Sequence, residues 1–305
     1  MSTTTKTPIL KELIIDHRTY KVEIYPCTSK PLDAPRLAIV SYQPNDQAKE
    51  LLRVCIDTIQ KTTSNPYELW IIDNNSPLDN CRWLLEIKDV NVVFNRTDPM
   101  LSRVQGLIKY ITTKFNFKYK HPVEASYANA IALELALQLI HPDTKYFMAL
   151  HMDTMPCHTN WLIFLQSKID QGYAGAGARI DKTRTPEGVL HVLGLMVNFP
   201  LFTSLNLNFL PSLPEFDTGD RVTVAFRNSG YKIYACRNTL WEPDLIKCIP
   251  LLSPMRKFQV DRAFDDKGNV IFLHLGRGIR KSSGKHIEGI TTKEWIEFAN
   301  NHIIN

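Results

Sequence analysis

The features that this sequence lacks exclude several classes of protein. Its six cysteines are scattered and form no Cys-x-x-Cys pair, which argues against a disulfide framework and indicates free thiols in a reducing compartment. No apolar stretch reaches the roughly 20 residues that span a bilayer. The N-terminal region also lacks the apolar core of a signal peptide. We therefore expect a cytoplasmic protein that makes at most peripheral contact with a membrane.

Strong positive charge and phosphate-binding glycine motifs are also missing. The net charge is only +5 over 305 residues, without a dense basic run that contains aromatics, so nucleic acid is not an expected partner. Such a mild positive charge suits an anionic ligand, such as a nucleotide diphosphate. The Gly-x-Gly of residues 172–177 leads into a strand-like run, whereas a dinucleotide-binding loop leads into a helix.

The pattern along the chain predicts an α/β fold. Residues 10–27 read as an N-terminal β-hairpin, because a period-two run follows a turn-like segment. From residue 37 on, continuous apolar strands alternate with helices, which predicts a Rossmann-like, mainly parallel central sheet flanked by helices. The expected strands are 37–42, 68–73, 90–95, 146–150, 174–180, 190–198, 231–235 and 270–275. The expected helices are 47–61, 81–87, 125–140, 160–169, 217–229 and 292–302.

The domain organisation follows from the same pattern. We see no internal repeat and no linker, so we expect one main domain over residues 36–290. Residues 1–35 form an N-terminal extension with the hairpin, and residues 291–305 form a C-terminal helix packed on the same domain. Residues 96–124 fit either a surface excursion or a lid over a ligand.

Polar clusters follow the predicted parallel strands at the points where they end. Ser41-Tyr42 follows the first and Asp73-Asn74-Asn75 the second, and parallel sheets bind ligands at these carboxyl ends. His151-Met152-Asp153 follows a later strand. An Asp at such a strand end can hold a hard divalent cation whose coordination shell is completed by substrate phosphates, although it can equally be an ordinary turn residue. The sequence thus predicts a ligand site at this edge.

Taken together, these segments resemble the family-2 glycosyltransferases, which have the GT-A fold. That family has Thr-Tyr-Asn and Val-Asp-Asn-x-Ser strand ends, an Ala-x-Asn at a helix start, an Asp-x-Asp motif, and an acidic pair before a helix that ends in Gly-Tyr. The matching segments here are Ser41-Tyr42-Gln43, Ile72-Asp73-Asn74-Asn75-Ser76, Tyr127-Ala128-Asn129-Ala130, His151-Met152-Asp153 with Pro156 and Trp161-Leu162, and Asp217-Thr218-Gly219-Asp220 before Gly230-Tyr231. The resemblance covers residues 36–275.

The resemblance implies a hexosyltransferase that inverts the anomeric carbon of its donor, a UDP-, GDP- or dTDP-linked sugar. Its acceptor is a glycan, a lipid-linked molecule or a protein. Asp73 would bind the base or ribose, and Ser41 and Tyr42 would border the base. The nucleotide-sugar site would further include Asn75, Asn129, Met152, Arg277 and Arg280.

The resemblance also implies a metal site, at which Asp153 binds a cation that bridges the two phosphates. His151 stands where the family has Asp, and His274 corresponds to a late histidine near the metal. Since histidine binds manganese better than magnesium, Mn²⁺ is expected, with Mg²⁺ as the alternative. Three interpretations of His151 stay open: a metal ligand, a contact to the sugar, or a histidine satisfied by its neighbours.

The catalytic base implied by the resemblance is Asp220 or Asp217, which would deprotonate the acceptor hydroxyl. The family has a Glu-Asp pair at this point, whereas here Gly219 precedes Asp220. Glu215 is a further candidate for the base. Both aspartates fit equally well as caps of the following helix.

Arg277 and Arg280 lie in a basic, glycine-containing segment that is either a solvated loop or a lid over the diphosphate. Two other functions stay open: a nucleotidyltransferase, and a catalytically inactive GT-A-like protein that binds glycans or partners.

Overall fold

The computed structural model describes residues 7–100, 123–179, 188–212 and 215–305, so most of the predicted excursion at 96–124 lies outside them. Within these residues, 12 strands form one continuous sheet in the order β1-β2-β5-β4-β3-β6-β9-β8-β10-β11-β12-β7. The strands are β1 Ile9–Ile15, β2 Arg18–Tyr25, β3 Arg36–Ser41, β4 Glu68–Asn74, β5 Val90–Asn95, β6 Tyr146–His151, β7 Thr154–Pro156, β8 Gly175–Arg179, β9 Leu190–Asn198, β10 Ile233–Asn238, β11 Asp261–Phe264 and β12 Val270–His274.

The helices follow the predicted alternation with the strands. They are α1 Asp46–Thr62, α2 Leu78–Cys81, α4 Val123–Leu139, α5 Trp161–Asp170, α6 Phe199–Ser204, α7 Asp220–Asn228, α8 Pro254–Lys257, α9 Gly278–Ser282 and α10 Thr292–Ala299. Short 3-10 turns occupy Arg82–Glu86 and Pro243–Cys248, and a π-turn ends the chain at Asn300–Ile304. None of the helices in the described ranges combines the length and apolar character needed to cross a membrane.

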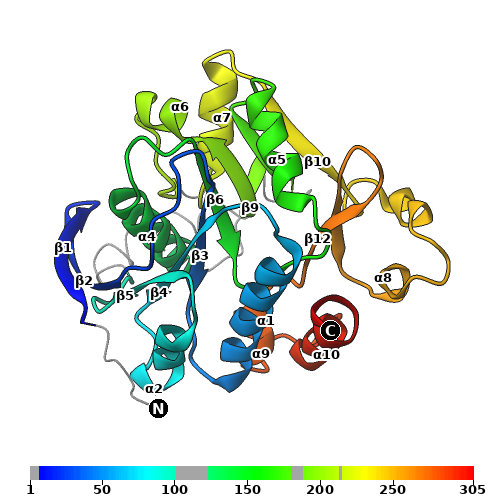
Figure 1. Ribbon diagram of the computed structural model, residues 1–305, viewed down its shortest axis with the longest axis horizontal. Helices are drawn as coiled ribbons and strands as arrows, with labels where there is room; N and C mark the ends of the chain where they lie inside the picture. The colour runs from blue at the N-terminus through cyan, green and yellow to red at the C-terminus, as the bar shows by residue number, and fades with distance from the viewer. Residues whose placement is uncertain (1–6, 101–122, 180–187, 213–214) are drawn as a thin grey trace.

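The centre of the sheet is parallel, as predicted. β5, β4, β3 and β6 pair in parallel, with Ser41 opposite Asp73 and Val40 opposite His151. Alternate side chains enter two separate cores: Leu37 and Ile39 pack with α1, whereas Ala38 packs with α4. Because helices cover both faces, the strands are apolar throughout. The predicted α/β fold class is therefore confirmed (Figure 1).

The N-terminal hairpin is also present, and it extends the main sheet. β1 and β2 pair across a tight turn at Asp16 and His17, which have positive φ angles of 47° and 62°. β2 then pairs antiparallel with β5. At the other end of the chain, Trp295 and Phe298 of α10 pack in the core that contains α1, and α1 lies against both α10 and β7.

A short antiparallel layer at the carboxyl ends of the parallel strands creates the site. β7 follows β6 after only two residues and pairs antiparallel with β12, so that Thr154 lies opposite His274. The backbone N–H of Leu275 donates to the carbonyl of Asp153 at 3.0 Å. The end of β12 is thereby fixed beside the turn that carries Asp153.

Candidate functional site

The three predicted metal ligands lie together in the structure. The ligand atoms of His151, Asp153 and His274 are all within 4.8 Å of one another. Oδ1 of Asp153 lies 3.5 Å from Nε2 of His274 and 3.9 Å from Nδ1 of His151. His151 ends β6, Asp153 occupies the β6–β7 turn, and His274 ends β12. Two segments more than 100 residues apart in sequence thus form one compact group.

The electrostatics of this group favour a charged carboxylate. Asp153 is only 6% exposed, and burial alone would raise its pKa. The imidazoles of His274 and His151 and the N–H of Gly278 outweigh burial and hold the pKa of Asp153 well below its usual range. Burial lowers the pKa of His274, but the Asp153 carboxylate reverses this and raises it. Asp153 is therefore ionised at neutral pH, as a metal ligand must be.

His274 carries an unsatisfied polar atom. Its Nδ1 is buried and has no hydrogen-bond partner among the described residues. Buried polar atoms are nearly always satisfied in proteins, and exceptions often mark a place for an ion or a water molecule. A donor set of two imidazoles and one carboxylate fits Mn²⁺ better than Mg²⁺, which prefers oxygen ligands. These residues therefore fit a divalent metal whose remaining positions are open to phosphate oxygens.

His151 is oriented by two neighbours. The Nδ2 atom of Asn129 lies 3.3 Å from Nε2 of His151, and the ring of His191 contacts His151 edge-on at 5.2 Å between centroids. Because the amide N–H of Asn129 faces Nε2, that nitrogen accepts, and Nδ1–H of His151 faces the Asp153 carboxylate. Asn129 is thus placed to select the tautomer of His151. His191 was not predicted from the sequence, because it lies within a strand and matches no motif.

Asp73 is the centre of a buried hydrogen-bond network. Its carboxylate accepts bonds from the hydroxyl groups of Ser41 and Ser76, at 2.9 and 2.6 Å, and from the side-chain amide of Gln43, at 3.1 Å. The N–H of Ser76 also donates to Asp73 at 3.0 Å, as in an Asx turn. Asp73 is fully buried. In this arrangement the carboxylate joins the ends of β3 and β4. Gln43 belongs to this hydrogen-bond network, although the sequence did not indicate a role for it.

The other predicted nucleotide-binding side chains divide between surface and core. Tyr42 is 44% exposed, and Asn75 is exposed with a positive φ of 66°. Both therefore remain accessible at the strand ends. Met152, by contrast, packs in the hydrophobic core at 5% exposure.

The two candidate bases lie at the start of α7. Asp220 is 2% exposed, and its carboxylate accepts a hydrogen bond from the N–H of Asp217 at 2.9 Å. Asp217 in turn accepts from the N–H of Thr218 at 2.7 Å. Next to them, Gly219 packs against Val192 of β9, which follows His191. The start of α7 therefore adjoins the strand whose His191 contacts the metal-ligand group.

The basic segment after β12 is a short helix rather than an open loop. Arg277 and Arg280 are both exposed, and Nη1 of Arg277 lies 3.4 Å from the ring of His286. Between them Gly278 is buried, and its N–H donates to Oδ2 of Asp153 at 2.9 Å. The segment is thus anchored on the metal-ligand group, with its arginines directed to the surface. Gly278 has no sequence signal of its own, since nothing indicated which glycine would meet Asp153.

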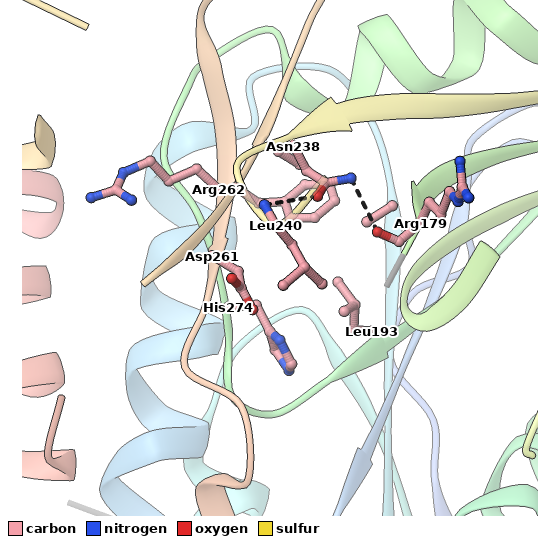
Figure 2. Close-up of a pocket in the computed structure, with 10 residues that line it drawn as sticks. Arg179, Leu193, Asn238, Leu240, Asp261, Arg262 and His274 are labelled. Atoms are coloured by element: carbon pink, nitrogen blue, oxygen red, sulfur yellow. Dashed lines mark hydrogen bonds between the residues drawn. The ribbon is translucent and has the colours of Figure 1, made fainter. Parts of the chain in front are cut away.

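Two cavities adjoin the β11–β12 hairpin and share Asp261, Arg262 and His274 in their walls. The larger has a volume of about 550 Å³, and the smaller has room for about one water molecule. Figure 2 shows the smaller, where Asn238 binds the backbone of Arg179 and Asp261 lies beside His274. Asp261 faces His274 in the strand register. This carboxylate was not predicted, because β11 itself was not.

No protein-family model and no curated protein sequence matches this chain. Among solved structures, mouse xyloside xylosyltransferase 1 is 14% identical over 66% of this chain and 84% of its own, with a TM-score of 0.40. The galactosyltransferase LgtC, in complex with donor and acceptor sugar analogues, is 11% identical over 88% and 96%, with a TM-score of 0.48. The 4-diphosphocytidyl-2C-methyl-D-erythritol synthase of Anaerococcus prevotii is 7% identical over 67% and 89%, with a TM-score of 0.41. At such values the likeness is confined to the general arrangement of the fold and assigns no residue a role.

Proposed function

We propose that this protein is a glycosyltransferase that moves a sugar from a nucleoside-diphosphate sugar to an acceptor hydroxyl group. The observation that carries the proposal is the group of His151, Asp153 and His274 at the carboxyl ends of the parallel strands. An ionised, buried carboxylate flanked by two imidazoles provides a site for a divalent metal. The bound metal would offset the charge of the departing diphosphate. Mn²⁺ is the expected ion and Mg²⁺ the alternative.

The side chains around this group have distinct roles in the proposal. Tyr42 and Asn75 border the nucleotide at the ends of β3 and β4, where Ser41 and Asp73 hold the strand ends in place. Arg277 and Arg280 supply positive charge beside the diphosphate, because Gly278 between them is bonded to Asp153. The donor is a UDP-, GDP- or dTDP-linked sugar.

The acceptor hydroxyl needs a base to take its proton as it attacks the sugar. Asp220 or Asp217 fills this role in the proposal, because Thr218, which lies between them in sequence, donates to the carbonyl of Ser126 on α4, the helix whose Asn129 lies beside His151. Attack from the face opposite the diphosphate inverts the anomeric carbon of the hexose. The acceptor is a glycan, a lipid-linked molecule or a protein. A cytoplasmic location with at most peripheral membrane contact belongs to the same proposal.

Turnover of candidate donors tests this function directly. The protein is incubated with Mn²⁺ and UDP-, GDP- or dTDP-sugars, and release of the nucleoside diphosphate is measured with water or added sugars as acceptors. We expect release from one nucleotide class, and its loss in Asp153→Asn. A nucleotidyltransferase would instead release pyrophosphate from a nucleoside triphosphate and a sugar phosphate. A correctly folded protein that binds a sugar nucleotide or glycan but turns over neither type of substrate would favour the inactive binding protein.

A further inference from the structure

The two ring nitrogens of His274 have different surroundings. Nε2 faces Oδ1 of Asp153 at 3.5 Å, whereas Nδ1 is buried and has no hydrogen-bond partner among the described residues. A histidine that binds a metal through Nε2 carries its proton on Nδ1. That N–H almost always donates to a carboxylate, a backbone carbonyl or a water molecule, which fixes the orientation of the ring. The Nδ1–H of His274 therefore needs an acceptor.

Asp261 lies directly opposite His274 in the β11–β12 pair. Opposite residues of an antiparallel pair project from the same face of the sheet, with Cβ atoms about 4.5–5.5 Å apart. Nδ1 is bonded to Cγ of the ring, so it lies close to the strand, at the height that an aspartate carboxylate on the opposite strand also reaches. Figure 2 shows the two side chains next to each other, and both line the two cavities beside the hairpin.

The Asp261 carboxylate is available for this contact. It is exposed, and it makes no hydrogen bond or ion pair with the rest of the described chain. Three cations line the larger cavity with it, namely Arg256, Arg262 and Lys281, and each donates to backbone carbonyls instead. These bonds hold the cations in place. His274 is thus the adjacent donor whose buried N–H the Asp261 carboxylate can satisfy.

We propose that Asp261 accepts the Nδ1–H of His274 and so positions this imidazole for metal binding. With its proton held on Nδ1, the ring presents an unprotonated Nε2 on the side of Asp153. The carboxylate also raises the basicity of Nε2, as carboxylates behind metal-binding histidines do. Rotation of the exposed Asp261 side chain is enough to form the bond. Asp261 acts through His274 rather than on the metal itself.

One part of this inference rests on the proposed function and the other does not. The effect on the metal requires that the group of His151, Asp153 and His274 binds a divalent cation. The hydrogen bond between Asp261 and His274 depends only on the strand register and on the buried Nδ1. The two parts therefore need separate measurements.

Proton NMR of the metal-free protein tests the hydrogen bond. At about pH 5.5 both ring nitrogens carry a proton, because an ordinary imidazole has a pKa of about 6.5. We expect a downfield Nδ1–H resonance in the parent, assigned to His274 by its absence in His274→Gln. It should move upfield or disappear through exchange in Asp261→Ala. The control, Asp143→Ala, removes an exposed carboxylate at the amino end of β6, far from the carboxyl end that carries His151, and should keep the resonance.

Titration calorimetry with Mn²⁺ tests the effect on the metal. We expect roughly tenfold weaker binding in Asp261→Ala, as for the loss of a partner that orients a metal ligand. Asp261→Asn keeps an acceptor oxygen for Nδ1–H but loses the charge, so its affinity should lie between those of the parent and Asp261→Ala. Asp143→Ala should bind Mn²⁺ as the parent does. Asp261 and Asp143 are both exposed, and circular dichroism verifies that each variant is folded.

Three results would overturn the proposal. The first is an Nδ1–H resonance that is absent from the parent or unchanged in Asp261→Ala, because Asp261 would then not accept this proton. The second is equal Mn²⁺ affinity of the parent and Asp261→Ala. The third is equal affinity of Asp261→Asn and Asp261→Ala, which would show that only the charge matters. A parent that shows the Asp261-dependent resonance but binds no Mn²⁺ would instead contradict the metal site of the proposed function, while the hydrogen bond would stand.

Discussion

The backbone N–H of Gly278 donates a hydrogen bond of 2.9 Å to Oδ2 of Asp153, across 125 positions of sequence. The two residues also touch in a way that only glycine allows. A Cβ atom at position 278 would lie 2.8 Å from Cβ of Asp153 and 2.9 Å from its Oδ2. The short helix α9 and the candidate metal ligand therefore fix each other's position.

Gly278→Ala should displace the Asp153 carboxylate, because the added methyl group occupies its place. We expect roughly tenfold weaker Mn²⁺ binding, as for the loss of a partner that orients a metal ligand. The strain should also lower the free energy of unfolding by about 1–3 kcal/mol. Titration calorimetry with Mn²⁺ measures the first effect. In the control, Gly175→Ala, the new Cβ meets nothing closer than 3.6 Å, so Mn²⁺ binding should not change. Equal affinities in both variants would argue that Asp153 does not bind the metal.

The composition of the metal-ligand group predicts which ions and nucleotides stabilise the protein. We expect Mn²⁺ to raise the melting temperature more than Mg²⁺, because two of the three side chains are imidazoles. One of UDP, GDP and dTDP should add to the Mn²⁺ effect; a ligand at about 100 times its Kd contributes about 2.7 kcal/mol. Thermal denaturation with each combination measures this. A stronger effect of Mg²⁺, unchanged in His151→Ala and His274→Ala, would show that the histidines are not ligands.

Gln43→Ala tests the buried network around Asp73. The Gln43 side chain donates to Asp73 at 3.1 Å and accepts from Nε1 of Trp83 at 2.8 Å. Truncation leaves the Trp83 N–H without this acceptor, which should cost about 1–3 kcal/mol of unfolding free energy. Urea denaturation measures the loss. The exposed Gln259→Ala serves as the control and should differ from the parent by less than about 0.5 kcal/mol. Equal stability of the two variants would contradict the network.

Glu134 makes stability depend on pH. Burial is the main cause that raises its pKa from 4.5 to about 7, against the opposing hydrogen bond from the N–H of Phe209. Because the folded-state pKa is the higher one, the folded protein binds more protons than the unfolded chain between these values. This contribution is therefore present below pH 4.5 and is lost as the pH rises through about 7.

Glu134→Gln, which cannot ionise, should remove this pH dependence. Relative to the parent, the variant gains roughly 1–3 kcal/mol between pH 4.5 and 7.5. Chemical denaturation across this range measures the gain. The exposed Glu86→Gln is the matched control, for which we expect the pH dependence of the parent. A Glu134→Gln variant that follows the same pH profile as the parent would contradict a raised pKa.

The parts of the fold that the sequence predicts well are those with long, uninterrupted patterns. β5 and β9 have the predicted bounds, because each is a mainly apolar segment that ends at an asparagine. β7 and β11 were missed, since three and four residues are too few to establish a period. Yet these two short strands build the antiparallel layer that brings His274 to Asp153.

The candidate site shows the same division. His151 and Asp153 follow the predicted strand 146–150, and His274 lies near the end of the predicted strand 270–275. The structure brings all three together, as the resemblance implied. Gly278 and Asp261 were not predicted, because their importance arises from a backbone contact and a strand register. For Asp73, by contrast, the sequence did indicate a role, but not the hydrogen bonds that the structure shows. Its motif suggested a ligand contact, whereas its complete set of protein hydrogen bonds is visible only in three dimensions.

Binding of Mn²⁺ followed by electron paramagnetic resonance tests the central claim most directly, because the signal of the free ion decreases as the protein binds it. The parent and Asp153→Asn are titrated with Mn²⁺, each alone and with the nucleoside diphosphate of the preferred donor. We expect the parent to bind about one equivalent, more tightly with the diphosphate, and Asp153→Asn to bind at least roughly tenfold more weakly. Equal binding by the parent and a folded Asp153→Asn, or no effect of any diphosphate, would contradict a metal-dependent nucleotide-sugar site at this position.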